Sequence, residues 1–99
     1  MNRNMLKQAQ QLQARLQKAQ QELESASVEG SAGGGAVKVV MTGKQLVESV
    51  EIAPEAAEDI EMLQDLIVAA MNDAANRVQE MASKKLGALT GGMNIPGLT

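Results

Sequence analysis

The sequence contains no cysteine, no histidine and no phenylalanine, tyrosine or tryptophan. Without cysteine the chain has no disulfide, no thiol nucleophile and no thiolate ligand for zinc, and without histidine it lacks the commonest general base and metal ligand. We therefore expect no enzyme activity, no metal site and no cofactor. The apolar share of 44% comes from small and aliphatic residues and seven methionines, so a thin hydrophobic core is expected in a single small domain.

Long apolar runs are also missing. No stretch approaches the roughly 18 apolar residues that suggest a membrane span, and the N-terminus lacks the apolar region of a signal peptide. A cytoplasmic protein is the simplest interpretation.

Acidic residues are absent from the first 21 positions, although the whole chain has a net charge of −3. The basic residues of this stretch are Arg3, Lys7, Arg15 and Lys18, and the first carboxylate is that of Glu22. Residues 22–65, in contrast, hold ten acids and two lysines. The sequence thus separates its charges by segment.

From Met5 onward, apolar residues recur at alternating spacings of four and three, which predicts a heptad helix over about residues 2–26. The apolar positions are Met5, Ala9, Leu12, Leu16, Ala19, Leu23 and Ala26. Such a helix is about 37 Å long. Because a core this small cannot cover that length, we expect part of the helix to project.

Residues 27–53 contain three β-prone runs, at about 27–32, 36–42 and 46–52, separated by short glycine-containing turns. Short turns predict a three-stranded antiparallel meander. Val37, Val39 and Met41 share one face of its middle strand, and Val50 and Ile52 supply apolar residues in the last.

A second helix is predicted from about residue 58 to 86, with acids near its start and Gly87 as its stop. Its first half is apolar on more than one side, and one sheet face cannot cover both sides. We therefore expect a second copy of the chain to cover the rest. The interface is expected at Met62, Leu66, Ile67, Ala70 and Met71. Residues 87–99 are expected to form a flexible tail.

If both helices pack on the same side of the sheet, the start of the first lies near the end of the second. This arrangement would bring Arg3 and Lys7 towards Lys84 and Lys85, at the far end of a helical arm. Phosphate backbones are a suitable ligand for such a basic tip, since lysine and arginine contacts release condensed counterions without any sequence readout. The same side chains are also typical of a solvated coiled-coil face.

The stretches VEGSAGGGAVKV and EMLQDLIVAAMNDA, together with the heptad helix and the closing TGGM, resemble the YbaB/EbfC family of bacterial nucleoid-associated proteins. The resemblance covers nearly the whole chain, with residues 1–86 as the domain. It implies an α+β homodimer whose projecting helices act as tweezers on double-stranded DNA. On this chain the basic positions of the projecting segments are Arg3, Lys7, Arg15, Lys18, Arg77, Lys84 and Lys85.

Other functions find less support in the sequence. Gly43-Lys44 is followed by Gln45 and lacks the earlier glycine of a P-loop, and the acids of residues 55–65 lack EF-hand spacing. Since single-strand binders stack bases on aromatic rings, the lack of aromatics favours duplex DNA read with low sequence specificity. The alternative is a protein-interaction adaptor, in which the heptad helix docks a partner's helix without binding DNA.

Overall fold

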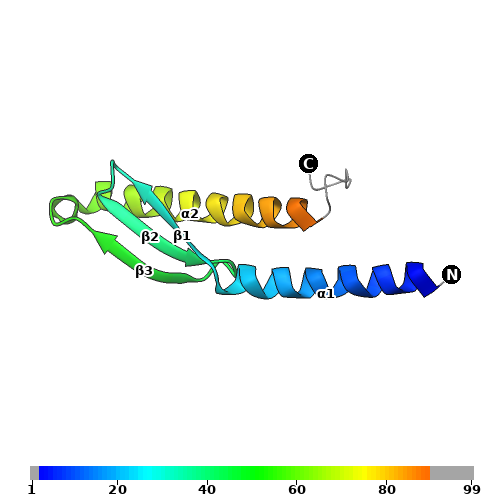
Figure 1. The fold of residues 1–99 in the computed structure, drawn as a ribbon. Coiled ribbons are helices and arrows are strands. Elements are labelled where there is room, and N and C mark those ends of the chain that lie inside the picture. The colour runs from blue at the N-terminus through cyan, green and yellow to red at the C-terminus, as the bar shows by residue number, and fades with distance from the viewer. Residues whose placement is uncertain (1–2, 90–99) are drawn as a thin grey trace.

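The computed structural model describes residues 3–89 and has the expected helix–sheet–helix order (Figure 1). The elements are α1 (Arg3–Ser25), β1 (Ser27–Ala32), β2 (Val37–Thr42), β3 (Val47–Ile52), the short 3₁₀ helix η1 (Ala56–Glu58) and α2 (Ile60–Leu89). The predicted α+β class is confirmed. The part of the predicted tail from Thr90 onward lies outside the described residues.

The second helix ends later than the sequence predicts. α2 continues through Gly87 to Leu89, three residues beyond Leu86. Glycine stops a helix when it adopts a left-handed conformation, and Gly87 does not adopt one. A glycine that keeps the helical conformation only weakens the helix, by about 1 kcal/mol relative to alanine.

The sheet is an antiparallel meander in the order β1-β2-β3, as predicted. Gly33, Gly34 and Gly35 form the first turn, with φ angles of 65°, 68° and 96°, which only glycine adopts without strain. Val37, Val39 and Met41 share one buried face of β2, as their alternation predicted. The turn glycines therefore set the register that directs this face to the core.

α2 packs on the face of the sheet that carries these three residues. Ala70, Ala74 and Val78 are its buried positions, and Asp59 caps its start by accepting a hydrogen bond from the Met62 N–H at 3.2 Å. At Gly30 the helix backbone comes so close that a Cβ would overlap the backbone of Ala74. Alanines on the helix and a glycine on the strand thus allow direct backbone packing, which explains how a core without aromatic residues closes.

β3 is left uncovered on the same face. Its residues Val50 and Ile52 lie opposite Val39 and Val37 of β2, so they point to the side of the sheet that α2 occupies. Their exposed fractions are nevertheless 45% and 37%. A single chain therefore leaves an apolar strand face open to solvent.

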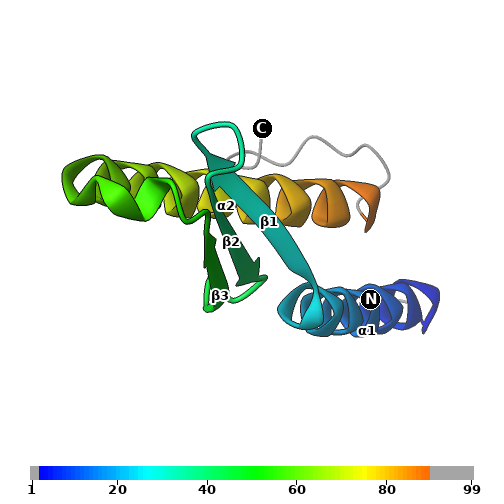
Figure 2. The ribbon, with the colours of Figure 1, turned by 90° about the vertical axis from the view of Figure 1, so that its left-hand side faces the viewer.

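The molecule is elongated. Its radius of gyration is 18.6 Å, against about 13 Å for a compact domain of 100 residues. α2 lies along one side of the sheet, whereas α1 leaves from the end of the sheet and runs past the end of α2 (Figures 1 and 2). The projection predicted from the length of the heptad helix is therefore present.

Candidate nucleic-acid interface

The base of α1 is the part of this helix that the rest of the chain holds. Ala19 and Leu23, the lower positions of the heptad seam, are 4% and 7% exposed. The turn after β2 fits closely beneath them, because a Cβ at Gly43 would overlap the carbonyl group of Leu23. Gly43 also donates its N–H to the Ala26 carbonyl at 3.0 Å. These contacts fix the direction in which α1 leaves the sheet.

Toward its N-terminus the same seam is open. Met5, Leu12 and Leu16 are 58%, 41% and 38% exposed. The four basic residues of α1 lie on the opposite side of the helix, within an arc of about 120° at 100° per residue. They are Arg3, Lys7, Arg15 and Lys18, and all four are exposed. The projecting arm therefore has one basic side and one apolar side.

The two lysines near the end of α2 do not lie with the tip residues as the sequence suggested. Lys85 forms an ion pair with Glu22 at the base of α1, so its neighbours are Arg15 and Lys18. The helices are antiparallel, but most of α2 packs on the sheet, and its end reaches only the C-terminal half of α1. The N-terminal turns of α1, the segment that holds Arg3 and Lys7, consequently extend beyond the last described turn of α2 (Figure 1).

A groove of about 330 Å³ marks the junction of the two helices. Arg15, Lys18, Glu22 and Lys85 supply its charged groups, and Leu89 lies at its α2 side. The hydrogen bond from Lys85 and the positive charges of Lys85 and Lys18 hold the pKa of the Glu22 carboxyl below its ordinary value. The junction thus carries three cations and one ionised acid.

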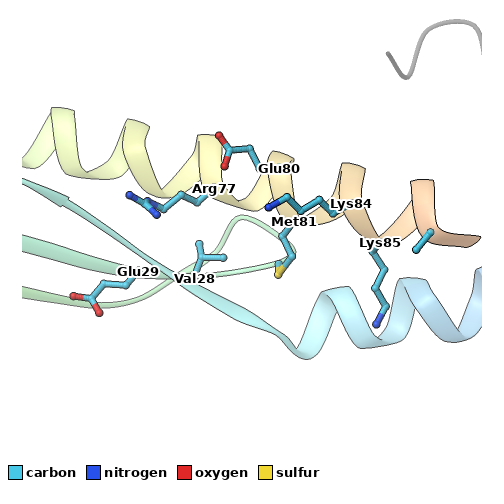
Figure 3. Close-up of a pocket in the computed structure, with 8 residues that line it drawn as sticks. Val28, Glu29, Arg77, Glu80, Met81, Lys84 and Lys85 are labelled. Carbon is cyan, nitrogen blue, oxygen red and sulfur yellow. The ribbon is translucent and has the colours of Figure 1, made fainter. Parts of the chain in front are cut away.

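A second groove, of about 620 Å³, lies between β1 and the second half of α2 (Figure 3). Arg77, Met81 and Lys84 of α2 and Val28 and Glu29 of β1 line it. Lys84 is exposed and forms no ion pair among residues 3–89.

Arg77 is held within the body of the chain. Its Nε lies 3.2 Å from Oδ2 of Asp73, and the same oxygen accepts the backbone N–H of Ser31 at 2.9 Å. These hydrogen bonds, from Ser31 first and from Arg77 second, lower the pKa of Asp73. Asp73 thus covers an N–H on the free edge of β1, a role that its sequence position did not reveal.

The residues expected at a dimer interface lie in different surroundings. Ala70 is fully buried in the core of its own chain, and Leu66 and Ile67 are partly buried against that core. Met62 and Met71 are 45% and 38% exposed. Leu66 reaches Gly33 near the β1 side, whereas the helical period puts Met71 on the flank of α2 opposite Asp73, toward uncovered β3.

The family model of the YbaB/EbfC DNA-binding family matches residues 1–93. The chain belongs to this family. Nucleoid-associated proteins of Alkaliphilus metalliredigens and Desulforamulus reducens are 56% and 54% identical to it, over 96% and 95% of this chain and 85% and 91% of theirs. The resemblance found in the sequence motifs is confirmed.

A solved structure has the same fold as this YbaB/EbfC chain. It is an uncharacterized protein of Helicobacter pylori, with a TM-score of 0.75 at 21% identity, covering 92% of this chain and 99% of that one. None of the helices within residues 3–89 is long and apolar enough to cross a membrane. The same residues contain no group of three or more acids placed to hold a metal ion.

Sequence reasoning missed three residues that shape the candidate interface. Gly30 and Gly43 are required for close backbone approach, yet in the sequence they are single glycines in a strand and a turn. Glu22 was read as the end of the basic segment, and its pairing with Lys85 spans 63 positions of the chain. A contact of that sequence separation leaves no periodic signal.

Proposed function

We propose that the protein is a nucleoid-associated homodimer that binds duplex DNA with low sequence specificity through its α1 arms. The observation that carries the proposal is the projecting arm. Its basic residues lie together on one side, and no acidic residue precedes Glu22 in the sequence. Membership of a DNA-binding family and the names of the relatives support it. Nucleoid association implies a cytoplasmic location and a role in bacterial chromosome organisation.

Dimerisation is supported by the open side of β3. Val47, Val50 and Ile52 expose apolar surface on the side of the sheet that α2 occupies, and Val68 and Met71 of α2 are exposed as well. A second copy would cover this surface and add a second arm. Two arms attached to one acidic body can contact separate phosphates of one duplex, which raises affinity through effective concentration.

The arms are expected to discriminate weakly between DNA sequences, because they contact phosphates mainly through charge. Base-edge contacts need arginine, asparagine or glutamine in the major groove at defined positions.

DNA binding is tested with a labelled duplex of arbitrary sequence across a salt series. We expect the logarithm of the binding constant to fall by about 0.9 per phosphate neutralised for each unit of log salt concentration. The variant Arg3→Glu/Lys7→Glu should bind at least tenfold more weakly at low salt, an order-of-magnitude estimate from the charge reversal.

The matched control is Lys38→Glu/Lys44→Glu, which changes net charge by the same amount on β2 and in the turn that follows it, rather than on the projecting part of the arm. Its loss of affinity should be clearly smaller. Equal losses of affinity in both variants would show that net charge alone governs binding and would contradict DNA binding through the α1 arm. Absence of wild-type binding at low salt would overturn the DNA-binding function itself.

The homodimer is tested by sedimentation equilibrium of the wild type and Val50→Asp. We expect the wild type to be a dimer and Val50→Asp to be shifted toward monomer. Burying the new carboxylate in the interface without a partner charge would cost roughly several kcal/mol. Ser49→Asp is the control, since Ser49 is the neighbouring residue on the opposite face of β3. A monomeric wild type, or dissociation by both variants alike, would contradict this interface.

The open seam of α1 favours a second candidate function. Met5, Leu12 and Leu16 present an exposed heptad stripe that another helix can cover. An adaptor of this kind would bind its partner with little dependence on salt and would lose binding on Leu12→Gln. A DNA binder would keep its DNA affinity in that variant, since Leu12 lies opposite the basic side of the helix.

A further inference from the structure

Glu22 stands out among the acids because it lies in the middle of a basic site. It is the first carboxylate of the chain, and its ion-pair partner, Lys85, comes from the other helix. Figure 3 shows the Lys85 side chain extending from α2 toward α1. Within residues 3–89, Arg15 and Lys18 form no ion pair, although they line the same groove.

The groove has the features of an anion site that already contains a competing anion. Three cationic side chains from two helices converge around one carboxylate, and the groove beside them is open to solvent. A backbone phosphate carries the same charge as the carboxylate and accepts the same hydrogen bonds from lysine and arginine. The two anions would therefore compete for Lys85.

We propose that this junction groove binds a phosphodiester of the DNA backbone and that Glu22 is its internal competitor, occupying Lys85 until a phosphate replaces it. This proposal rests on the DNA-binding function proposed above. In the free protein Glu22 neutralises Lys85. The charge of Lys85 becomes available to DNA only when its ion pair with Glu22 breaks. Glu22 thereby weakens binding to every duplex and adds to the reversibility of the complex.

The geometry distinguishes this role from that of an ordinary surface ion pair. An exposed pair contributes little to stability, since salt and side-chain entropy offset most of the attraction. The Glu22 pair, however, removes one of the three cations that face the groove. Its main consequence is therefore expected in anion binding rather than in folding.

The test compares the DNA affinity of the wild type, Glu22→Gln and Glu24→Gln in a phosphate-free buffer, so that free phosphate does not occupy the groove. Glutamine keeps the size and a hydrogen-bonding oxygen at position 22 while removing the charge. Glu24 lies two residues away on the same helix and pairs instead with Lys44, at 3.9 Å. Both variants change the net charge equally, so their difference isolates the groove.

We expect Glu22→Gln to bind the duplex about three- to tenfold more tightly than Glu24→Gln at low salt, as removal of one repulsive charge close to a phosphate predicts. Its salt dependence should steepen by about 0.9 in the logarithmic slope for each phosphate newly contacted. Circular dichroism checks that all three proteins are equally folded. Equal affinities and slopes in the two variants would overturn the competitor role while leaving the DNA-binding function intact.

Lys85 supplies an independent check. Lys85→Met should lower DNA affinity more in the Glu22→Gln background than in the wild type, where Glu22 already occupies this lysine. The difference between the two backgrounds is the coupling of a double-mutant cycle. Equal losses in both backgrounds, or weaker DNA binding by Glu22→Gln itself, would show that Glu22 only fastens α1 to α2. If neither the wild type nor Glu22→Gln binds DNA, the function and the competitor role both fail.

Discussion

The two helices of this protein have comparable lengths but are held in different ways. α2 lies on the sheet, and its small residues Ala70 and Ala74 are fully buried against it. α1 is buried only near its C-terminal end, at Ala19 and Leu23, and the remainder projects. The comparison teaches that residue size decides which helix belongs to the core. Alanine and glycine bring backbones together, whereas a leucine seam without a facing surface leaves a helix free to bind something else.

The largest expected effect concerns the contact that seats α2. Gly30→Ala places a methyl group against the backbone of Ala74, which cannot yield as a flexible side chain would. We expect a loss of about 3 kcal/mol in the free energy of unfolding. Because the chain lacks aromatic residues, unfolding in urea is followed by far-ultraviolet circular dichroism at fixed protein concentration.

Gly87→Ala is the matched control for that substitution. Among residues 3–89, apart from the neighbouring residues of its own helix, no atom lies within 4 Å of the position that its Cβ would take, and the residue is helical. Alanine there should stabilise the protein by up to about 1 kcal/mol. If both substitutions changed the free energy of unfolding in the same direction, the role of Gly30 in the close packing of α2 on β1 would be contradicted.

The next effect concerns the junction that directs α1. Gly43→Ala forces the turn after β2 away from the Leu23 carbonyl. We expect a loss of about 2 kcal/mol, less than at Gly30 because the turn lies at the end of the sheet and can shift. Amide hydrogen exchange should show faster exchange at Gly43 itself, whose N–H is bonded to Ala26 in the wild type. Unchanged exchange there would contradict a fixed junction.

The two ends of the heptad seam provide a direct contrast. Leu23→Ala removes a buried side chain and should cost about 2 kcal/mol, at the low end of the range for such truncations. Leu12→Ala removes an exposed one and should change the free energy of unfolding by less than about 0.5 kcal/mol. Urea titrations of the two variants measure both values. A large loss at Leu12 would mean that another copy of the chain covers the open seam of α1 in solution.

The smallest effect is a pH dependence at the α2–β1 contact. The pKa of Asp73 is lowered in the folded state, first by the Ser31 N–H and then by Arg77, so the folded state binds the proton less readily than the unfolded chain. The stability that Asp73 contributes is thus fully present above the unfolded pKa of about 4. It is lost as the pH falls through the lower, folded pKa.

Asp73→Asn should therefore have a lower melting temperature than the wild type at pH 7, and this difference should shrink progressively below about pH 4. Asp65→Asn, an exposed change on the same helix, controls for lost charge. Thermal melts between neutral and acidic pH measure the difference. If the difference in melting temperature stayed constant across this pH range, the ionised Asp73 carboxylate could not be its cause.

Much of this fold could be read from local patterns. The heptad spacing predicted α1, the alternation of Val37, Val39 and Met41 predicted the buried face of β2, and three adjacent glycines predicted the first turn. These features follow from the periods of helices and strands, which a sequence displays directly. The family motifs were equally legible, and the family match confirmed them.

The candidate site was less accessible to such reading. The exposed basic residues of α1 could be named from composition, but the expectation that Arg3 and Lys7 lie near Lys84 and Lys85 assumed helices of matching extent. The position of α2 on the sheet depends on packing at Gly30, and the direction of α1 depends on packing at Gly43. Packing of this kind involves contacts between distant positions, which periodicity does not encode.

By itself, the sequence determined the element types, the order of the strands, the charge separation and the absence of the side chains that most catalysis needs. Only the tertiary structure decided that β3 stays uncovered, that Asp73 covers the edge of β1, and that Lys85 meets Glu22 rather than the arm tip. The physical reason is that periodicity reports the surroundings of neighbouring residues. The partners of a charged side chain depend on where whole helices come to rest.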